Sequence, residues 1–99
     1  MEQFIKQPGE SYFIGFDFVN RLPSGATLSS GTVAAIDLED LSTQSTIVLA
    51  STTATISGTT AKVKVQAGTH DRKYKITFSV TLSSAEVLQE DVVMQVQDL

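Results

Sequence analysis

The chain has 99 residues, of which 41% are hydrophobic and 18% are charged, and it contains no cysteine. This length and balance are typical of one globular domain, and the lack of cysteine excludes disulfides, thiolate zinc sites and cysteine nucleophiles. The formal net charge of −4 argues against a nucleic-acid partner, because neutralising phosphates needs a dominantly basic surface.

The amino-terminal segment "MEQFIKQPGE" is predicted to be an arm, residues 1–10, ahead of a single domain at residues 11–99. It lacks the basic and apolar regions of a secretory signal, and no apolar run reaches the ~18 residues of a membrane span. We therefore expect a protein that is made and folded in a cytoplasm, with no membrane partner.

The first strong strand pattern is "YFIGFDFV", which alternates between a core face and an outer face. Phe13 and Val19 are apolar but point away from the core face. A strand that is apolar on both faces is covered either by the arm, through Phe4 and Ile5, or by another chain. We therefore predict an assembly interface that includes Phe4, Ile5, Phe13 and Val19, and we leave open which chain covers it. The residues expected on the core face are Tyr12, Ile14, Phe16 and Phe18.

Valine, isoleucine, serine and threonine dominate the middle of the chain, which favours strands. Residues 26–38 ("ATLSSGTVAAIDL") and 45–52 ("STIVLAST") are predicted as two strands, and residues 54–57 ("ATIS") as a short third. No segment shows a helical period. Turn signals recur at the intervals of a sandwich.

An acidic stretch, "DLED" (residues 37–40), overlaps the end of the predicted strand at residues 26–38. Asp37, Glu39 and Asp40 are carboxylates of the kind that Ca²⁺ prefers. The stretch lacks the Asp-x-Asp-x-Asp-Gly pattern with a distal glutamate, so a solvated acidic loop is the simpler interpretation.

The last three predicted strands alternate clearly, at residues 61–67, 73–82 and 87–97. The final two are joined by the short polar loop "SSAE", which predicts a hairpin. The fold class expected is therefore all-β, a single Ig-like or fibronectin III-like antiparallel β-sandwich of about seven strands without a disulfide. The residues expected inside are Ala61, Val63, Val65, Ala67, Tyr74, Ile76, Phe78, Val80, Leu82, Leu88, Val92, Met94 and Val96.

The stretch "AGTHDRKYKI" carries the only histidine, His70, just before one of these strands. Tyr74 follows a polar corner, as in the tyrosine corner of Ig-like and fibronectin-like sandwiches, where the hydroxyl bonds upstream backbone. We therefore predict Tyr74 as a structural corner. A catalytic His70–Asp71 pair would need a nucleophile or a substrate pocket nearby, and the sequence nominates neither. A solvated loop is the expected structure.

Five basic residues form a local basic region on this acidic chain: Lys62, Lys64, Arg72, Lys73 and Lys75. On outward strand faces they predict solubility and edge protection, and the alternative is an acidic partner surface. The glycines form no phosphate loop, and no nucleophile–base–orienter set is present. We therefore expect no enzyme, no cofactor, no metal and no small-molecule substrate.

Four stretches carry a resemblance to a known group of proteins. They are "KQPGE" with its Lys-x-Pro element, the aromatic strand "IGFDFVNRL", "SGATLSSGTV", and the segment from "ISGTTAKVKV" to "EDVVMQV". In these the chain resembles small β-sandwich structural proteins of tailed phages and prophages, of the fiber–tail adaptor or head–tail and tail component type. Phe16, Phe18 and Val33 stand where that group usually has tryptophan.

The resemblance implies a non-catalytic virion structural protein, a tail or head–tail junction subunit that works through protein–protein assembly. It implies synthesis in the host cytoplasm, other virion structural proteins as partners, and a homo-oligomer in the assembled particle. The alternative is an Ig-like binding module for a glycan or a cell-surface partner, which predicts a platform of exposed aromatic side chains.

Overall fold

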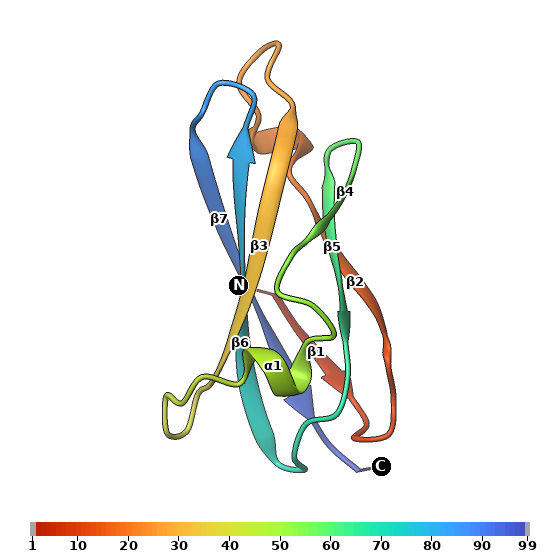
Figure 1. The fold of residues 1–99 in the computed structure, drawn as a ribbon. Coiled ribbons are helices and arrows are strands. Elements are labelled where there is room, and N and C mark those ends of the chain that lie inside the picture. Colours follow the sequence, from red (N-terminus) through yellow and green to blue (C-terminus); the bar gives the residue numbers. More distant parts are fainter. Residues whose placement is uncertain (1, 99) are drawn as a thin grey trace.

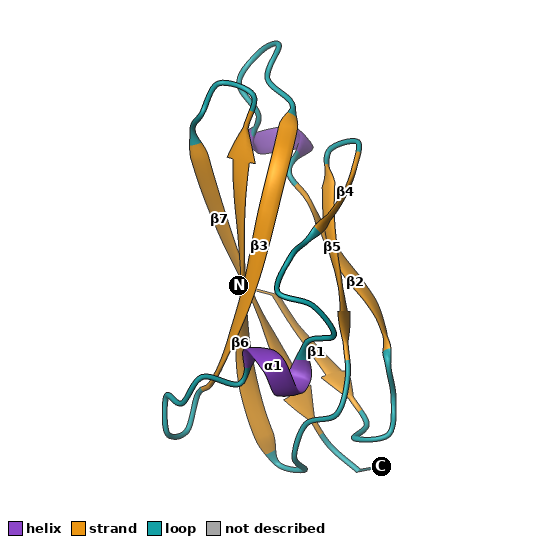
Figure 2. Ribbon diagram, viewed as in Figure 1, coloured by secondary structure: helices purple, strands orange, loops and turns teal. Residues whose placement is uncertain are grey.

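The computed structural model describes residues 2–98, whose strands form two stacked sheets (Figure 1). The larger sheet has the order β1-β7-β6-β3 and the smaller sheet β2-β5-β4. Figure 2 shows that strands and loops make up nearly the whole chain, which confirms the predicted all-β class and its seven strands. The elements are β1 (Glu2–Lys6), β2 (Tyr12–Asp17), η1 (Val19–Arg21), β3 (Leu28–Asp37), α1 (Ser45–Val48), β4 (Thr55–Ser57), β5 (Thr60–Val65), β6 (Arg72–Leu82) and β7 (Val87–Val96).

The strand order follows that of Ig domains when β2 is taken as strand B. The smaller sheet is then B-E-D, and the larger sheet contains G-F-C. β1 lies beyond β7 and runs parallel to it, whereas the other strand pairs are antiparallel. This parallel pair is the one departure from the purely antiparallel sandwich that the sequence predicts.

The core lies between the sheets and follows the predicted alternation. In β6, every second residue from Tyr74 to Leu82 is buried. Burying one side chain such as Phe78 contributes about 1.5–3 kcal/mol. β5 buries Ala61, Val63 and Val65, but Ala67 is exposed because the backbone has left the sheet and turns there with a φ of +48°.

β6 and β7 form the predicted hairpin. They pair from Arg72↔Val96 to Thr81↔Val87. The connecting turn is closed by the Leu82 amide, which donates to the Glu86 carbonyl at 2.8 Å.

The strand predicted at residues 45–52 is wrong, because its first half forms the one-turn helix α1. Ser45 explains the difference, since its buried hydroxyl accepts a hydrogen bond from the Ala35 amide at 2.9 Å and holds the segment against β3. Val48 is fully buried, and Leu49 makes only an isolated bridge to β5. Tertiary contacts have overridden the strand preference of the sequence.

Within residues 2–98, no helix is long and apolar enough to cross a membrane.

The amino-terminal arm supplies the seventh strand instead. Residues 2–6 form β1, which pairs with β7 up to the Lys6↔Val96 position. The division into residues 1–10 and 11–99 stays a prediction, and the outermost residue at each end lies outside the described residues.

Each sheet has two edge strands. Of these four strands, two are short and a third has its free edge covered. The free edge of β3 is covered by the segment after it, because the Val33 amide donates to Thr52 and the Gln44 amide to the Ala35 carbonyl. β4 is 3 residues long and β1 is 5. β2, with 6 residues, is the longest strand with a free edge in the described chain.

Candidate functional site

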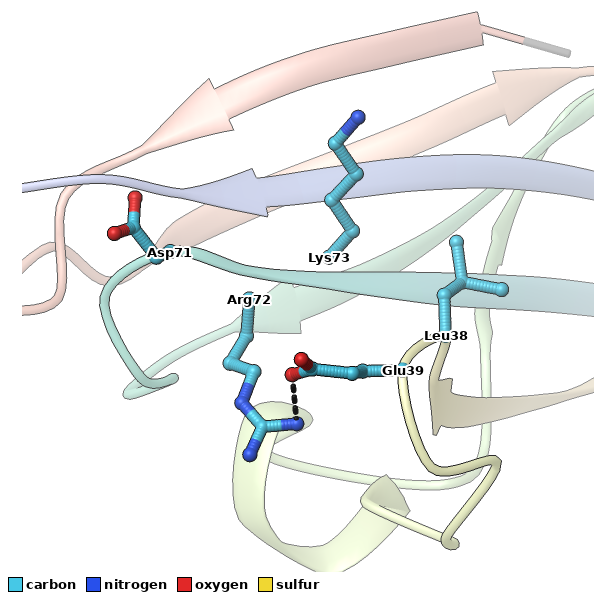
Figure 3. Close-up of a pocket in the computed structure, with 5 residues that line it drawn as sticks. All are labelled: Leu38, Glu39, Asp71, Arg72 and Lys73. Atoms are coloured by element: carbon cyan, nitrogen blue, oxygen red, sulfur yellow. Dashed lines mark ion pairs between the residues drawn. The ribbon is translucent and has the colours of Figure 1, made fainter.

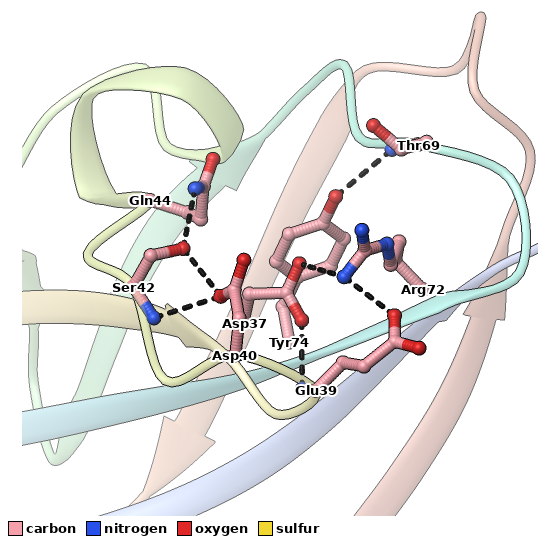
Figure 4. Close-up of polar contacts among 8 residues, drawn as sticks. All are labelled: Asp37, Glu39, Asp40, Ser42, Gln44, Thr69, Arg72 and Tyr74. Carbon is pink, nitrogen blue, oxygen red and sulfur yellow. Dashed lines mark hydrogen bonds and ion pairs between the residues drawn. The ribbon is translucent and has the colours of Figure 1, made fainter.

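The tyrosine predicted as a structural corner lies at the start of β6 with its ring in the core. Tyr74 is buried, and its hydroxyl accepts a hydrogen bond from the Thr69 amide at 2.9 Å (Figure 4). The bond ties β6 to the loop that precedes it. This is the geometry of a tyrosine corner, and the structural role of Tyr74 stays a prediction.

His70 lies in the same loop and faces no nucleophile among the described residues. Its Nδ1 accepts a hydrogen bond from the Asp98 amide at 2.9 Å, and its Nε2 lies 3.5 Å from Oδ2 of Asp71. Both side chains are more than half exposed. General acid–base catalysis needs the reacting group within hydrogen-bond reach. The loop therefore fits a solvated corner.

Arg72 is the first residue of β6, and its guanidinium pairs with two carboxylates of the acidic stretch. Its Nη1 lies 3.1 Å from Oδ2 of Asp37 and also pairs with Glu39 (Figure 4). Asp37 is buried, contrary to the predicted solvated loop, and its Oδ1 accepts a hydrogen bond from the Glu39 amide at 2.8 Å. A buried carboxylate without a partner would carry a large desolvation penalty, so the arginine makes this burial tolerable.

Asp40 is held by Ser42, whose hydroxyl and amide donate to its Oδ1 at 2.6 and 2.9 Å. These hydrogen bonds lower the pKa of Asp40 below its usual 3.8. A calcium site needs several oxygen ligands that converge on one point, and here the carboxylates converge on Arg72 and Ser42 instead. No group of three or more His, Cys, Asp or Glu side chains that could hold a metal is found in residues 2–98.

A small hollow lies between the loop after β3 and the start of β6. Its volume is about 240 Å³, below the roughly 300 Å³ at which ligand pockets begin. Figure 3 shows Arg72 and Glu39 paired beside it, with Asp71 and Lys73 pointing away from the pair. The hollow is lined by charged side chains, and its arginine is already paired with Glu39.

The predicted basic region is divided by the fold. Lys62 and Lys64 lie on the outer face of the smaller sheet, in β5, whereas Lys73 and Lys75 lie on the outer face of the larger sheet, in β6. The fifth residue, Arg72, is paired with carboxylates. The lysines therefore form two separate groups, one on the outer face of each sheet.

The four residues predicted as an assembly interface lie in different places. Phe4 points inward and packs against the core, with its ring centroid 6.4 Å from that of Tyr12. Ile5 is 53% exposed on the outer face of the larger sheet, Phe13 62% exposed on the outer face of the smaller sheet, and Val19 52% exposed in η1. The arm lies in cis but leaves Phe13 and Val19 uncovered, and the interface stays a prediction.

Lys6 is a feature that sequence reasoning missed. It is fully buried, and its Nζ donates to the carbonyls of Ala67 at 2.6 Å, Gln7 at 2.8 Å and Pro8 at 3.4 Å. Burial lowers the pKa of Lys6, and the charge of Glu10 offsets part of this effect. The signal in the sequence is its phase, two residues after Phe4 on an alternating strand that ends in a Pro-Gly turn.

The comparison with protein families decides the group to which this fold belongs. The family model of podophage GP4 fiber-tail adaptor protein gp77 matches residues 6–95. The chain belongs to this family. No match is found among curated proteins.

Membership in the fiber-tail adaptor family confirms the resemblance to phage structural proteins drawn from the sequence. The match begins at Lys6 and ends one residue before the end of β7, so it includes the complete smaller sheet, the polar corner and the hairpin. The chain is a tail adaptor-type structural protein. Such proteins are virion components that contact other tail proteins.

Proposed function

We propose that this chain is a non-catalytic subunit of the junction between the tail and its fibers in a phage or prophage particle. The observation that carries the proposal is the family match over residues 6–95, which covers nearly all of both sheets. The hollow beside Arg72 is too small to suggest a substrate site, and its arginine is already paired with Glu39. The protein therefore acts through protein–protein contacts.

The partners are other virion structural proteins together with further copies of this chain, assembled after synthesis in the host cytoplasm. Ile5, Phe13 and Val19 are exposed apolar side chains that such contacts would cover. The free edge of β2 offers a backbone surface for the same purpose.

The test is made on particles. Phage particles purified from a host carrying the gene are expected to contain the protein at a fixed stoichiometry by mass spectrometry. Particles from a deletion mutant are expected to keep their tails and lose their fibers, and a wild-type copy supplied in trans restores them. Complete, fibered particles that lack the protein would contradict the proposal.

The binding-module alternative predicts several exposed aromatic side chains on one surface. Phe13 is the one aromatic among the large hydrophobic side chains that are exposed in the described chain. A single phenylalanine stacks one sugar ring at most, so nothing in the structure favours glycan binding over assembly.

A further inference from the structure

We propose that β2 is the assembling edge of this protein and that its partner is the β2 strand of a second copy, paired antiparallel about Gly15. The pair joins two smaller sheets into one continuous sheet. The inference rests on the proposed assembly function, and it specifies which strand pairs two copies of the chain and in which register.

The free edge of β2 carries backbone groups that β5 does not use. The Phe18 amide donates to the Thr59 carbonyl at 2.8 Å, which continues the β2–β5 ladder. In an antiparallel ladder the hydrogen-bonded pairs alternate, so even-numbered residues of β2 bond to β5. The backbone N–H and C=O groups of Phe13, Gly15 and Asp17 therefore point to the free edge.

The two adjacent free edges of the sandwich differ in their protection. β1 ends at Lys6, an inward-pointing charge, and runs into Pro8, and both features discourage the addition of another strand. β2 has no lysine and no proline from Tyr12 to Asp17, and it carries an exposed phenylalanine. Figure 1 shows β2 as the outermost strand of the smaller sheet. Unprotected edges of this kind pair with other strands.

The register about Gly15 makes β2 complementary to itself. It places Gly15 opposite Gly15 of the second copy and Phe13 opposite Asp17, so that all three residues with free backbone groups form hydrogen-bonded pairs. On the inner face, Ile14 lies opposite Phe16, and both are half-buried apolar side chains at the rim of the core. The pairing covers apolar surface with apolar surface.

The charges on the outer face agree with this register. Lys64 lies beside Phe13 on the β5 side. Asp17 of the second copy would lie on the other side of Phe13, so that lysine and aspartate of opposite charge flank the ring. Two-fold symmetry repeats the arrangement. This charge complementarity favours a second copy over an unrelated strand.

The first test compares two edge strands in the full-length protein by sedimentation equilibrium. The wild type is expected to form a dimer, and Phe13→Lys is expected to weaken dimerisation by at least about tenfold. Ile5→Lys is the matched control, because Ile5 is similarly exposed and points outward from β1. It should leave the dimer unchanged. Thermal melts check that both variants fold.

The second test traps the register. Because the chain has no cysteine, Gly15→Cys forms a disulfide only between copies. Directly paired residues have Cα atoms about 5.5 Å apart, within disulfide range. A Cβ at Gly15 would lie 3.1 Å from Cγ of Lys62, 3.1 Å from Cγ2 of Thr60 and 3.3 Å from the Ala61 carbonyl oxygen, so thermal melts check that Gly15→Cys folds. If it does not, the double variant Phe13→Cys with Asp17→Cys replaces it, and Ile5→Cys is the control that should not cross-link.

Three results would overturn the inference. One is a wild-type protein that stays monomeric at about 1 mM, a concentration that reveals even weak association. Another is a dimer that Ile5→Lys disrupts and Phe13→Lys does not. The third is a β2 edge occupied by a different tail protein while the chain alone is monomeric. Failure of the proposed function is separate, because it is measured by the protein's presence in particles.

Discussion

At the scale of residues, three contacts hold the loop between β5 and β6. The Thr69 amide donates to the Tyr74 hydroxyl, and the Ala67 carbonyl accepts from Nζ of Lys6. Gly68 has a φ of +99°, and a Cβ there would lie 2.7 Å from a methyl of Val96. The loop thus joins β1, β6 and β7, which explains why a lysine far from it in sequence is buried beside it.

Tyr74→Phe is expected to lower the free energy of unfolding by about 1 kcal/mol, because the Thr69 amide loses its hydrogen-bond partner. Urea denaturation followed by circular dichroism measures the change. Tyr12→Phe is the matched control, since the Tyr12 hydroxyl makes no hydrogen bond to a described residue. Equal denaturation curves for wild type and Tyr74→Phe would show that the Tyr74 hydrogen bond does not contribute to stability.

Lys6→Met is expected to destabilise the fold by about 2 kcal/mol, because it removes charged hydrogen bonds to three carbonyls. Lys73→Met, on the exposed outer face, should change stability by less than about 0.5 kcal/mol. Denaturation of both variants under the same conditions gives the comparison. A Lys6→Met protein as stable as wild type would show that the buried amine contributes only packing.

The pH dependence of stability provides a separate test of Lys6. Because burial lowers its pKa from 10.5, the unfolded chain binds this proton more tightly than the folded protein. This contribution to stability is present above pH 10.5 and is lost as pH falls through the folded-state pKa. The stability difference between wild type and Lys6→Met should therefore shift in favour of wild type as pH rises from neutral toward 10.5. A constant difference would contradict the lowered pKa.

At the scale of elements, β1 and β2 are neighbours with different roles. β1 is fastened to β7 and to the loop before β6, and its own edge is blunted by Lys6 and the following turn. β2 is bonded on one side only. The arm that the sequence places outside the domain thus completes one sheet, and the strand after it is left free for a partner.

Deletion of residues 1–9 tests the proposed division between arm and domain. The remaining residues 10–99 are expected to fold, because both sheets keep at least three strands, but with a lower melting temperature, since Phe4 and Lys6 are lost. A scanning melt with a far-ultraviolet spectrum measures both properties. An unfolded product would show that residues 1–9 are part of the domain.

Calcium is expected to leave the melting temperature unchanged, because Asp37 and Glu39 are paired with Arg72 and Asp40 is held by Ser42. Melts in millimolar calcium and in chelator are compared. Any ligand that binds the folded state raises its stability, so a clear rise in calcium would show that the loop rearranges to bind it.

At the scale of the whole molecule, the alternation of apolar and polar residues is the strongest information in the sequence. It assigns the inward faces of β2, β5, β6 and β7 and the hairpin that ends the chain, because each is encoded by neighbouring residues along one strand. Together with the turn spacing, it identifies the β-sandwich. The family resemblance required no knowledge of long-range contacts either, since it lies in turns and strands.

Other features depended on contacts between distant residues and were decided only by the tertiary structure. The arm forms a parallel strand because it pairs with β7 and because the Ala67 carbonyl accepts a hydrogen bond from Lys6. Residues 45–48 became a helix because Ser45 meets the backbone of β3. Sequence by itself determined which residues face the core in β2, β5, β6 and β7 and that β6 and β7 form a hairpin; only the fold decided which other strands meet, because pairing energy comes from partners that the local pattern does not contain.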